Sequence, residues 1–308
     1  MIRVEGFTKR FGHLTAVRDF SLRVDQGDIF GFIGPNGAGK TTTIRFLATL
    51  LKPTHGKAWI NGRSVTEDPM SVRQSIGYMP DSFGVYEGMR VWEYLDFFAA
   101  AYSIKKNKRK DIIRDVIQLL DLESKQDDFV EGLSRGMKQR LCLAKTLLHD
   151  PKVLILDEPA SGLDPRARHY IKELLKELQR MGKTIFISSH ILSELADCCN
   201  TIGIMERGVL LAAGRVKDIL SQVRENMVLE VEMLEESPEA VALCREHDGV
   251  QNVEAFGTVI RLEYAGDIRA IPDLHKRLLD RQVPVLFFRE VPTNLEEVFM
   301  KVTKGEVA

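Results

Sequence analysis

Residues 34–41 combine glycines, a lysine and a threonine in a spacing that suits the binding of phosphate groups. They read Gly34-Pro35-Asn36-Gly37-Ala38-Gly39-Lys40-Thr41, which matches the pattern GxxxxGK[ST]. An apolar run over residues 29–33 precedes them, and Thr42 begins a stretch with helical spacing. Glycines let consecutive backbone N–H groups turn toward one phosphate cluster, and a helix start adds partial positive charge. We therefore expect this segment to bind a nucleoside triphosphate, with Lys40 on the β- and γ-phosphates and the Thr41 hydroxyl on Mg²⁺.

A pair of carboxylates follows a second apolar run. Residues 153–156 are uninterrupted apolar residues, as a buried parallel strand requires, and they lead into Asp157-Glu158-Pro159. At the carboxyl end of such a strand, Asp157 can hold Mg²⁺ directly or through water. Glu158 can accept a proton from the water that attacks the γ-phosphorus. The alternative, a solvent-exposed acidic turn, is disfavoured by the apolar run before the pair and by the phosphate loop upstream.

Two further segments suit phosphate contacts. His190 ends the predicted strand 185–189, and since that strand should neighbour the acidic one, we expect His190 to contact the γ-phosphate. A lone histidine is more often structural. Residues 133–137 read Leu-Ser-Arg-Gly-Met before a helix that runs to Leu148, and a serine at a helix start is an anion-binding platform. This second platform makes sense if Ser134 serves the nucleotide of another protomer.

The periodicity of hydrophobic residues and the positions of turn residues predict the helices and strands that must position these side chains. Residues 1–80 alternate short strands with turns, including 58–60 followed by the hairpin dipeptide Asn61-Gly62. Residues 89–149 are helical, with two apolar stripes that run through Val91, Tyr94, Leu95 and Phe98 and through Ile112, Val116, Leu119 and Leu120. Beyond 153–156, we predict helices over 165–181 and about 191–199 and a strand over 184–187.

The pattern changes again after about Leu220. Strands are predicted over 228–234, 250–255, 259–264 and 285–288, and helices over 239–247, 268–281 and 295–301. The order βαββαβα is compatible with a small split βαβ sandwich, although Pro272 weakens one helix. We therefore expect an α/β phosphate-loop domain over residues 1–220, with a helical subdomain at about 89–149, and an α+β domain over 221–308.

Bulk composition indicates a soluble globular protein. Of the 308 residues, 44% are hydrophobic and 28% charged, and the net charge of −1 gives no reason to expect nucleic acid as a partner. We see neither a transmembrane run nor a signal peptide, so we expect a cytoplasmic location. The four cysteines are expected to be reduced. The basic run 105–110 is interpreted as a solvated helix start, with proximity to an anionic membrane as the alternative.

Taken together, residues 1–220 resemble the ATP-binding subunit of an ABC transporter. The resemblance implies that residues 34–41 form the Walker A loop, that residues 154–157 form the Walker B strand and that Glu158 is its catalytic carboxylate. It makes His190 the H-loop histidine and Phe11 the aromatic that stacks on adenine. Residues 133–137 correspond to the LSGGQ signature, and 161–164 to the D-loop. The implied fold is a P-loop cassette with a mixed sheet, an antiparallel β subdomain and an inserted helical subdomain.

Residues 220–308, with the closing segment 292–299, resemble the accessory C-terminal domain of exporter-type cassettes. Such cassettes pair with a separately encoded ABC-2 type permease, which implies a peripheral place on the cytoplasmic face of the membrane. The implied mechanism is hydrolysis of ATP, with Mg²⁺, in a homodimer that closes head to tail. Each ATP would then lie between the Lys40 loop of one protomer and four residues of the second protomer, Ser134, Arg135, Gly136 and Asp164.

Two motifs depart from the family pattern, the Q-loop at one position and the signature at two. Asp81 stands where the Q-loop glutamine should follow residues 77–80, and an aspartate is shorter, negative and only an acceptor. Asp81 either binds Mg²⁺ more directly or stays withdrawn until the permease engages. Arg135 replaces the first glycine of the signature and Met137 its glutamine, while Ser134 and Gly136 remain. Arg135 either adds a cationic contact to the opposing γ-phosphate or faces solvent.

The sequence disfavours two other functions. A soluble ABC ATPase of DNA repair, chromosome structure or translation usually carries tandem cassettes or long coiled-coil insertions. The sequence has one phosphate loop, no sustained heptads and no net positive charge, which disfavours that class. A non-hydrolysing regulatory subunit would have lost the catalytic carboxylate, and Glu158 is present.

Overall fold

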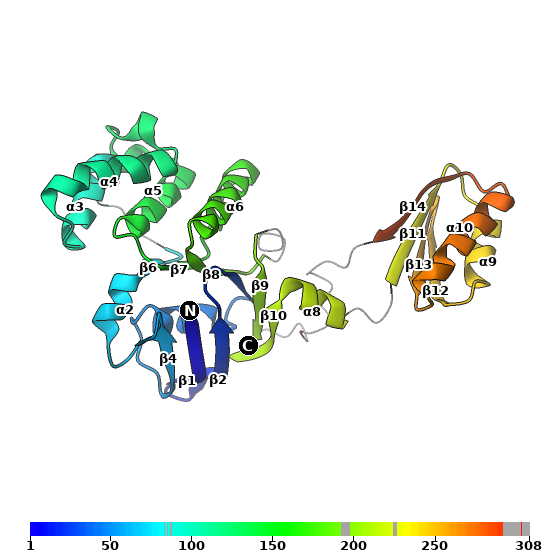
Figure 1. Ribbon diagram of the computed structural model, residues 1–308, viewed down its shortest axis with the longest axis horizontal. Helices are drawn as coiled ribbons and strands as arrows, with labels where there is room; N and C mark the ends of the chain where they lie inside the picture. Colours follow the sequence, from blue (N-terminus) through cyan, green and yellow to red (C-terminus); the bar gives the residue numbers. More distant parts are fainter. Residues whose placement is uncertain are drawn as a thin grey trace. The chain divides into compact units, whose positions relative to one another are not determined.

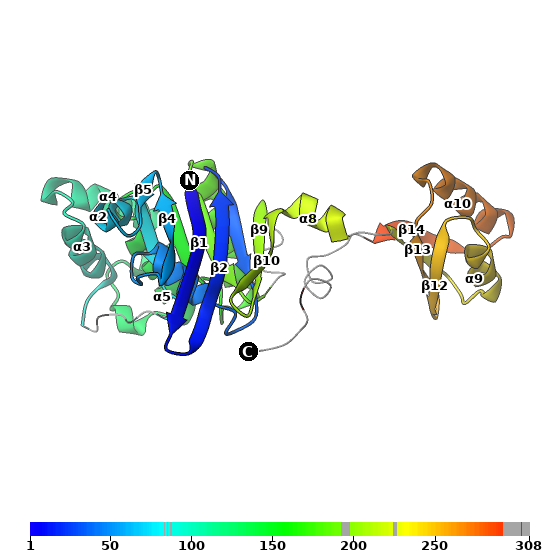
Figure 2. The same ribbon diagram turned by 90° about the horizontal axis from the view of Figure 1, so that it is seen from below.

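The computed structural model describes residues 1–82, 84, 86, 88–191, 198–223, 227–291 and 303 (Figures 1 and 2). The predicted helix 295–301, the closing segment 292–299 and most of the predicted helix 191–199 lie outside the described residues. The chain forms two compact units, of which the first contains Met1–Val216 and the second begins at Lys217. The domain limits expected from the sequence, 1–220 and 221–308, stay a prediction.

An antiparallel sheet in the first unit has the strand order β2-β1-β4-β5. Its strands are β1 (Ile2–Phe11), β2 (Leu14–Val24), β4 (His55–Ile60) and β5 (Arg63–Ser64). Alternation along β1 buries the side chains of Ile2 and Val4, and Phe7 is also buried after a shift of register that follows Val4. The predicted hairpin at Asn61-Gly62 is confirmed, because β4 pairs with β5 and both turn residues have positive φ.

The central sheet has the order β10-β9-β3-β8-β7-β6. Its strands are β3 (Ile29–Ile33), β6 (Ile76–Met79), β7 (Val153–Asp157), β8 (Thr184–Ser189), β9 (Thr201–Glu206) and β10 (Val209–Arg215). All neighbours are parallel except β9 and β10, and β3, β7 and β8 are buried along their whole length. This mixed sheet confirms the predicted fold class. Parallel order also brings the carboxyl ends of β3, β7 and β8 to one edge.

Helices of the first unit are α1 (Lys40–Leu47), α2 (Pro69–Ser75), α3 (Val91–Ala101), α4 (Lys106–Leu119), α5 (Arg135–Leu147) and α6 (Pro165–Arg180), with short 3₁₀ turns at Glu123–Lys125 and Val130–Gly132. The helices α3, α4 and α5 pack together as the expected helical block (Figure 1). The stripe predicted on α3 is confirmed at Val91, Tyr94 and Leu95. The stripe predicted on α4 is partly wrong: Val116 and Leu120 are buried, but Ile112 and Leu119 are only half-buried. Because α4 packs against both α3 and α5, the stripe runs instead through Ile113 and Ile117.

The second unit is a four-stranded antiparallel sheet in the order β12-β13-β11-β14. Its elements are β11 (Met227–Met233), α9 (Pro238–Arg245), β12 (Val250–Phe256), β13 (Val259–Tyr264), α10 (Ile271–Asp280) and β14 (Val285–Val291), and α8 (Val216–Val223) precedes them. The predicted order βαββαβ is confirmed. Pro272 does not interrupt its helix, because it lies in the first turn of α10, where no intrahelical N–H is needed.

Two bulk expectations can be compared with the structure. Within the described part of the chain, none of the helices combines the length and the apolar character that crossing a bilayer demands. All four cysteines are free thiols in buried positions, as expected from the sequence.

Candidate nucleotide-binding and hydrolysis site

The loop between β3 and α1 is held in a conformation that only glycine adopts readily at two positions. Gly37 has φ of +81° and Gly39 has φ of +104°. Gly34 has a different reason to lack a side chain, since a Cβ there would lie 2.2 Å from the carbonyl oxygen of Met205 on β9. The loop is therefore packed directly against neighbouring backbone, and this packing fixes the direction of its N–H groups.

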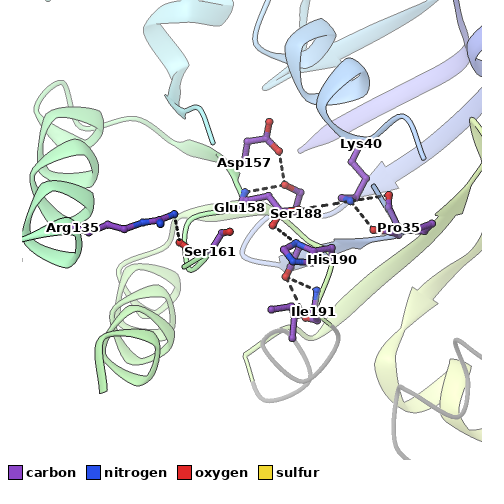
Figure 3. Close-up of polar contacts among 11 residues, drawn as sticks. Pro35, Lys40, Arg135, Asp157, Glu158, Ser161, Ser188, His190 and Ile191 are labelled. Carbon is purple, nitrogen blue, oxygen red and sulfur yellow. Dashed lines mark hydrogen bonds and ion pairs between the residues drawn. The ribbon is translucent and has the colours of Figure 1, made fainter. Parts of the chain in front are cut away.

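The buried side chain of Lys40 lies inside this loop. Its Nζ donates to the carbonyl oxygens of Gly34 at 2.6 Å and Pro35 at 3.2 Å, and lies 3.7 Å from Glu158 Oε1 (Figure 3). Burial lowers the pKa of Lys40, and the charges of Glu158 and Asp157 partly oppose that change. An ammonium whose neutral partners are only carbonyl oxygens can exchange them for a phosphate, which offers a stronger, charge-assisted bond.

The acidic pair lies where β7 runs beside β8, with Asp157 opposite Ser188. The Ser188 hydroxyl donates to Asp157 Oδ1 at 2.6 Å and accepts from the backbone N–H of Glu158 at 3.0 Å. Burial raises the pKa of Asp157, which is 1% exposed; hydrogen bonds from Ser188 and Thr41 lower it, and the charge of Asp81 raises it further. The charge of this buried carboxylate, beside a threonine hydroxyl, is only partly compensated. Such oxygen donors suit a hard divalent cation.

Glu158 occupies a backbone conformation that is uncommon for a residue with a side chain, with φ of +53°. Its carboxylate lies between two groups, since Oε2 is 2.5 Å from His190 Nδ1 and Oε1 is 3.7 Å from Lys40 Nζ. Figure 3 shows Lys40, Glu158 and His190 converging from the start of α1, the end of β7 and the end of β8. The structure thus brings together Lys40, Glu158 and His190, which the sequence places far apart.

A pocket of about 860 Å³ opens over these residues. Its lining includes the loop residues 35–42 together with Phe11, Asp81, Glu158, Ser161, His190 and Arg207. This volume lies within the usual range for nucleotide-sized ligands. The ring of Phe11 is 49% exposed at the pocket, with Lys9 Nζ 4.9 Å from its centre. Sequence reasoning missed Arg207 and Ser188; a polar residue near the end of an otherwise apolar strand was the available signal for Ser188.

The residues expected to act from a second protomer lie elsewhere. None of Ser134, Arg135, Gly136 and Asp164 lines the pocket over Lys40, a statement that covers the part of the chain the structure describes. The Ser134 hydroxyl caps α5, accepting from the N–H of Met137 at 3.3 Å, and Asp164 caps α6. Hydrogen bonds from the backbone N–H groups of Ala167 and Arg166 lower the pKa of Asp164. Both remain candidates for contacts between two copies.

Arg135 is exposed, which agrees with the alternative that it faces solvent, and its contact with the γ-phosphate of a second protomer stays a prediction. Its guanidinium Nη2 donates to the carbonyl oxygen of Ser161 at 3.2 Å.

Asp81 is exposed and lies at the rim of the nucleotide pocket, close enough to Asp157 to raise the pKa of that carboxyl. Both alternatives for Asp81 stay predictions.

Replacing Asp157 by asparagine is expected to stabilise the nucleotide-free protein at neutral pH. Since the folded-state pKa of Asp157 is raised, ionising it opposes folding once the pH exceeds the pKa of the unfolded chain. Asparagine is uncharged and can still accept from Ser188. We expect a gain of about 1 kcal/mol, or about 2–4 °C in Tm, that shrinks as the pH is lowered toward 4.

Thermal melts at several pH values test this expectation. The same variant should lose the stabilisation that ATP with Mg²⁺ gives the unmodified protein. A Tm at pH 7.5 below that of the unmodified protein would show that charged Asp157 is favourable in the nucleotide-free fold, contrary to our reading of its pKa.

Comparison with known proteins gives a consistent result across the chain. The family model for ABC transporters matches residues 17–161. A second model, described as the ATP-binding protein DrrA1-3-like C-terminal domain, matches residues 214–303. The two matches fall on the two compact units.

Individual relatives match over nearly their full length. The chain is 34% identical to the uncharacterized ABC transporter ATP-binding protein YhcH of Bacillus subtilis (strain 168), with 98% of this chain and 96% of that protein covered. It is 35% identical to the Nod factor export ATP-binding protein I of Rhizobium sp. (strain N33), covering 99% and 98%. It is 29% identical to the linearmycin resistance ATP-binding protein LnrL of Bacillus subtilis (strain 168), covering 98% of each.

Solved structures of ABC transporter subunits resemble about 72% of the chain. A structure described as the ATP binding subunit of an ABC transporter has a TM-score of 0.66 and 31% identity, covering 72% of this chain and 92% of that one. The cbiO1 protein of Clostridium perfringens, described as part of the ABC transporter complex cbiONQ, has a TM-score of 0.66 and 27% identity, covering 72% and 90%.

Proposed function

We propose that this chain, which belongs to the family of ABC transporter ATP-binding proteins, powers an ABC-2 type exporter. Membership establishes an ATP-binding subunit with ATPase activity. The proposal adds the direction, the type of permease and the mode of closure. One observation carries it: Lys40, Asp157, Glu158 and His190 converge at the edge of the central sheet, beside one nucleotide-sized pocket. Relatives named for Nod factor export and linearmycin resistance, with the match over residues 214–303, support the exporter assignment.

ATP is expected to bind with its phosphates in the loop of residues 34–41. Backbone N–H groups and Lys40 Nζ would hold the β- and γ-phosphates, and the ammonium would exchange the carbonyl oxygens of Gly34 and Pro35 for phosphate oxygens. The Thr41 hydroxyl and Asp157 would hold Mg²⁺, which when bound supplies positive charge that neutralises the phosphate oxygens. The buried, raised-pKa carboxylate of Asp157 fits that cation. Phe11 would stack on the adenine.

Hydrolysis requires a base beside the γ-phosphate, and Glu158 is placed for that role. Its carboxylate would accept the proton of the attacking water as the oxygen of that water bonds to the γ-phosphorus and the bond to the β,γ-bridging oxygen breaks. The Ser188 hydroxyl accepts a hydrogen bond of 3.0 Å from the backbone N–H of Glu158 and so holds the backbone of Glu158 in place. His190, which now contacts Glu158 at 2.5 Å, would turn its ring N–H to the γ-phosphate. Glu158 would then be free to orient the water.

Closure of two copies would complete the site. Ser134, Gly136 and Asp164 lie outside the pocket of their own chain, so a second copy turned by a two-fold axis could offer them to the opposing ATP. A ligand at a hundred times its dissociation constant favours the bound state by about 2.7 kcal/mol per site. Loss of the γ-phosphate would remove that bridge and let the pair reopen. The block 89–149, where Trp92 is 42% and Phe97 46% exposed on α3, would transmit closure to the permease.

Co-expression with an ABC-2 type permease tests the transporter assignment. The proposal expects the chain to be retained by membranes when the permease is present and to be released when it is absent. Purification from solubilised membranes should then recover the integral protein with it. A strong stimulation of ATP turnover by nucleic acid, without membrane retention, would instead favour a soluble ABC ATPase of DNA repair, chromosome structure or translation.

Substitutions at Asp81 are expected to change the Mg²⁺ dependence of turnover. A carboxylate about 5 Å from a phosphate charge would cost about 3 kcal/mol at an effective dielectric constant of 20, and a cation between them offsets that cost. If the Asp81 carboxylate is a ligand of Mg²⁺, Asp81→Asn and Asp81→Gln should each raise the half-saturating Mg²⁺ concentration roughly three- to tenfold, because a charged ligand is lost. If Asp81 acts once the permease engages, the two variants should instead alter the stimulation of turnover by the permease. Unchanged kinetics in both variants would dispose of a role for the Asp81 carboxylate.

A further inference from the structure

Asp81 and Arg135, two of the residues that depart from the family pattern, line the same cavity. A cavity of about 350 Å³ is lined by Asp81, Ser82, Arg135, Lys138 and Gln139. Asp81 also lines the nucleotide pocket, so it lies between the two spaces. The sequence places Asp81 and Arg135 far apart and gives no sign that they meet.

Arg135 contacts the loop that follows Glu158. Its guanidinium donates to the carbonyl oxygen of Ser161 at 3.2 Å (Figure 3). It also covers Gly162, where φ is +68° and a Cβ would lie 2.4 Å from the guanidinium carbon. One turn further along α5, the buried amide of Gln139 donates to the carbonyl oxygen of Pro159. The first turns of α5 therefore hold the segment 159–162 at two points.

The charges around the small cavity are of opposite sign. Asp81 brings a carboxylate that would repel the phosphates of a bound nucleotide, and Arg135 brings a guanidinium that opposes this effect. Lys138 also lines the cavity, but its Nζ donates to the carbonyl oxygen of Glu131 at 2.9 Å, away from the segment 159–162. A family member with glutamine in place of Asp81 and glycine in place of Arg135 lacks both the negative charge of the carboxylate and the positive charge of the guanidinium that balances it.

We propose that Arg135 is a positioning residue for ATP hydrolysis and that Asp81 is its counter-charge across the cavity. Arg135 fixes the segment 159–162, and through it the backbone that carries Glu158, by its bond to Ser161. Asp81 and Arg135 compensate each other, so that the pair replaces the neutral glutamine and glycine of the family pattern. This inference rests on the proposed ATPase site and assigns regulation of its geometry to two residues of this chain.

A double-mutant cycle on the full chain tests the pair through two readouts. Arg135→Gly should lower kcat about tenfold or more, because the segment after Glu158 loses its anchor, and Arg135→Lys should recover part of that loss. Arg135→Gly should also weaken ATP binding about fivefold in the presence of Asp81 but less than twofold in the Asp81→Gln background. The two effects then differ by at least about 2.5-fold, which corresponds to a coupling of at least about 0.5 kcal/mol.

Lys138→Ala is the matched control, because it removes a cation that lines the same cavity but does not bond to the segment 159–162. It should leave kcat within twofold and show no coupling to Asp81→Gln. Thermal melts of every variant report folding separately. Additive effects on ATP binding, or unchanged kcat in both Arg135 variants, would overturn the inference while the unmodified protein still hydrolyses ATP. Absence of ATPase activity in the unmodified protein would instead contradict the proposed function.

Discussion

Replacing Glu158 by glutamine is expected to lower ATP turnover by about 10²–10⁴-fold while ATP still binds. The amide keeps the size of the side chain but cannot accept the proton of the attacking water. Binding should persist because the loop of residues 34–41, Lys40 and Asp157 are untouched. The charge that now attracts Lys40 at 3.7 Å and His190 at 2.5 Å would also disappear, which frees both groups for the γ-phosphate.

Steady-state phosphate release and equilibrium ATP binding, measured on the same preparation, separate the two effects. Glu173→Gln is a suitable control, since that carboxylate is exposed on α6 and pairs with Lys176 at 2.9 Å. It should leave turnover unchanged. A Glu158→Gln protein that turns over at the rate of the unmodified protein would show that another group is the base.

Replacing Lys40 by alanine is expected to abolish most of the affinity for ATP. The ammonium is the one side-chain cation that the structure places inside the loop of residues 34–41 among its described residues. A charge-assisted hydrogen bond to a phosphate is worth about 1.5–3 kcal/mol, so the loss of two such bonds weakens binding by about 10²–10⁴-fold. Folding should be little affected, because burial already lowers the pKa of Lys40 and so disfavours its charged form.

Calorimetric titration with ATP and Mg²⁺ measures this loss directly. Lys176→Ala provides the control, because that lysine is an ordinary surface residue of α6 whose Nζ pairs with Glu173. Retained affinity in the Lys40→Ala protein, with intact folding by thermal melt, would mean that the phosphates bind elsewhere.

Much of the site could be predicted because its chemistry follows continuous apolar runs. Residues 153–156 are uninterrupted in hydrophobic character, so they could only be a buried strand, and Asp157 and Glu158 had to lie at its carboxyl end. The same reasoning placed His190 after β8. The split βαβ order of the second unit was accessible for a similar reason, since its strands are separated by clear turn residues.

Other features depend on tertiary contacts that carry no local signal. The apolar residues of α4 offer two overlapping stripes, and only packing against α3 and α5 selects the one through Ile113 and Ile117. The positive φ of Glu158 is uncommon for a residue with a side chain, so its residue type does not indicate it. The bond from exposed Arg135 to the carbonyl oxygen of Ser161 joins segments that are far apart in the sequence, so no local pattern indicates it.

Sedimentation of the Glu158→Gln protein with ATP and Mg²⁺, compared with ADP, tests the central claim most directly. That claim is that ATP between two copies of the chain holds them together and that its hydrolysis lets them part. The account predicts a dimer with two bound ATP molecules, which reverts to monomer in ADP and does not form when Ser134 is also replaced by a bulky residue. A protein that remains monomeric with ATP bound, both alone and with its permease, would contradict it.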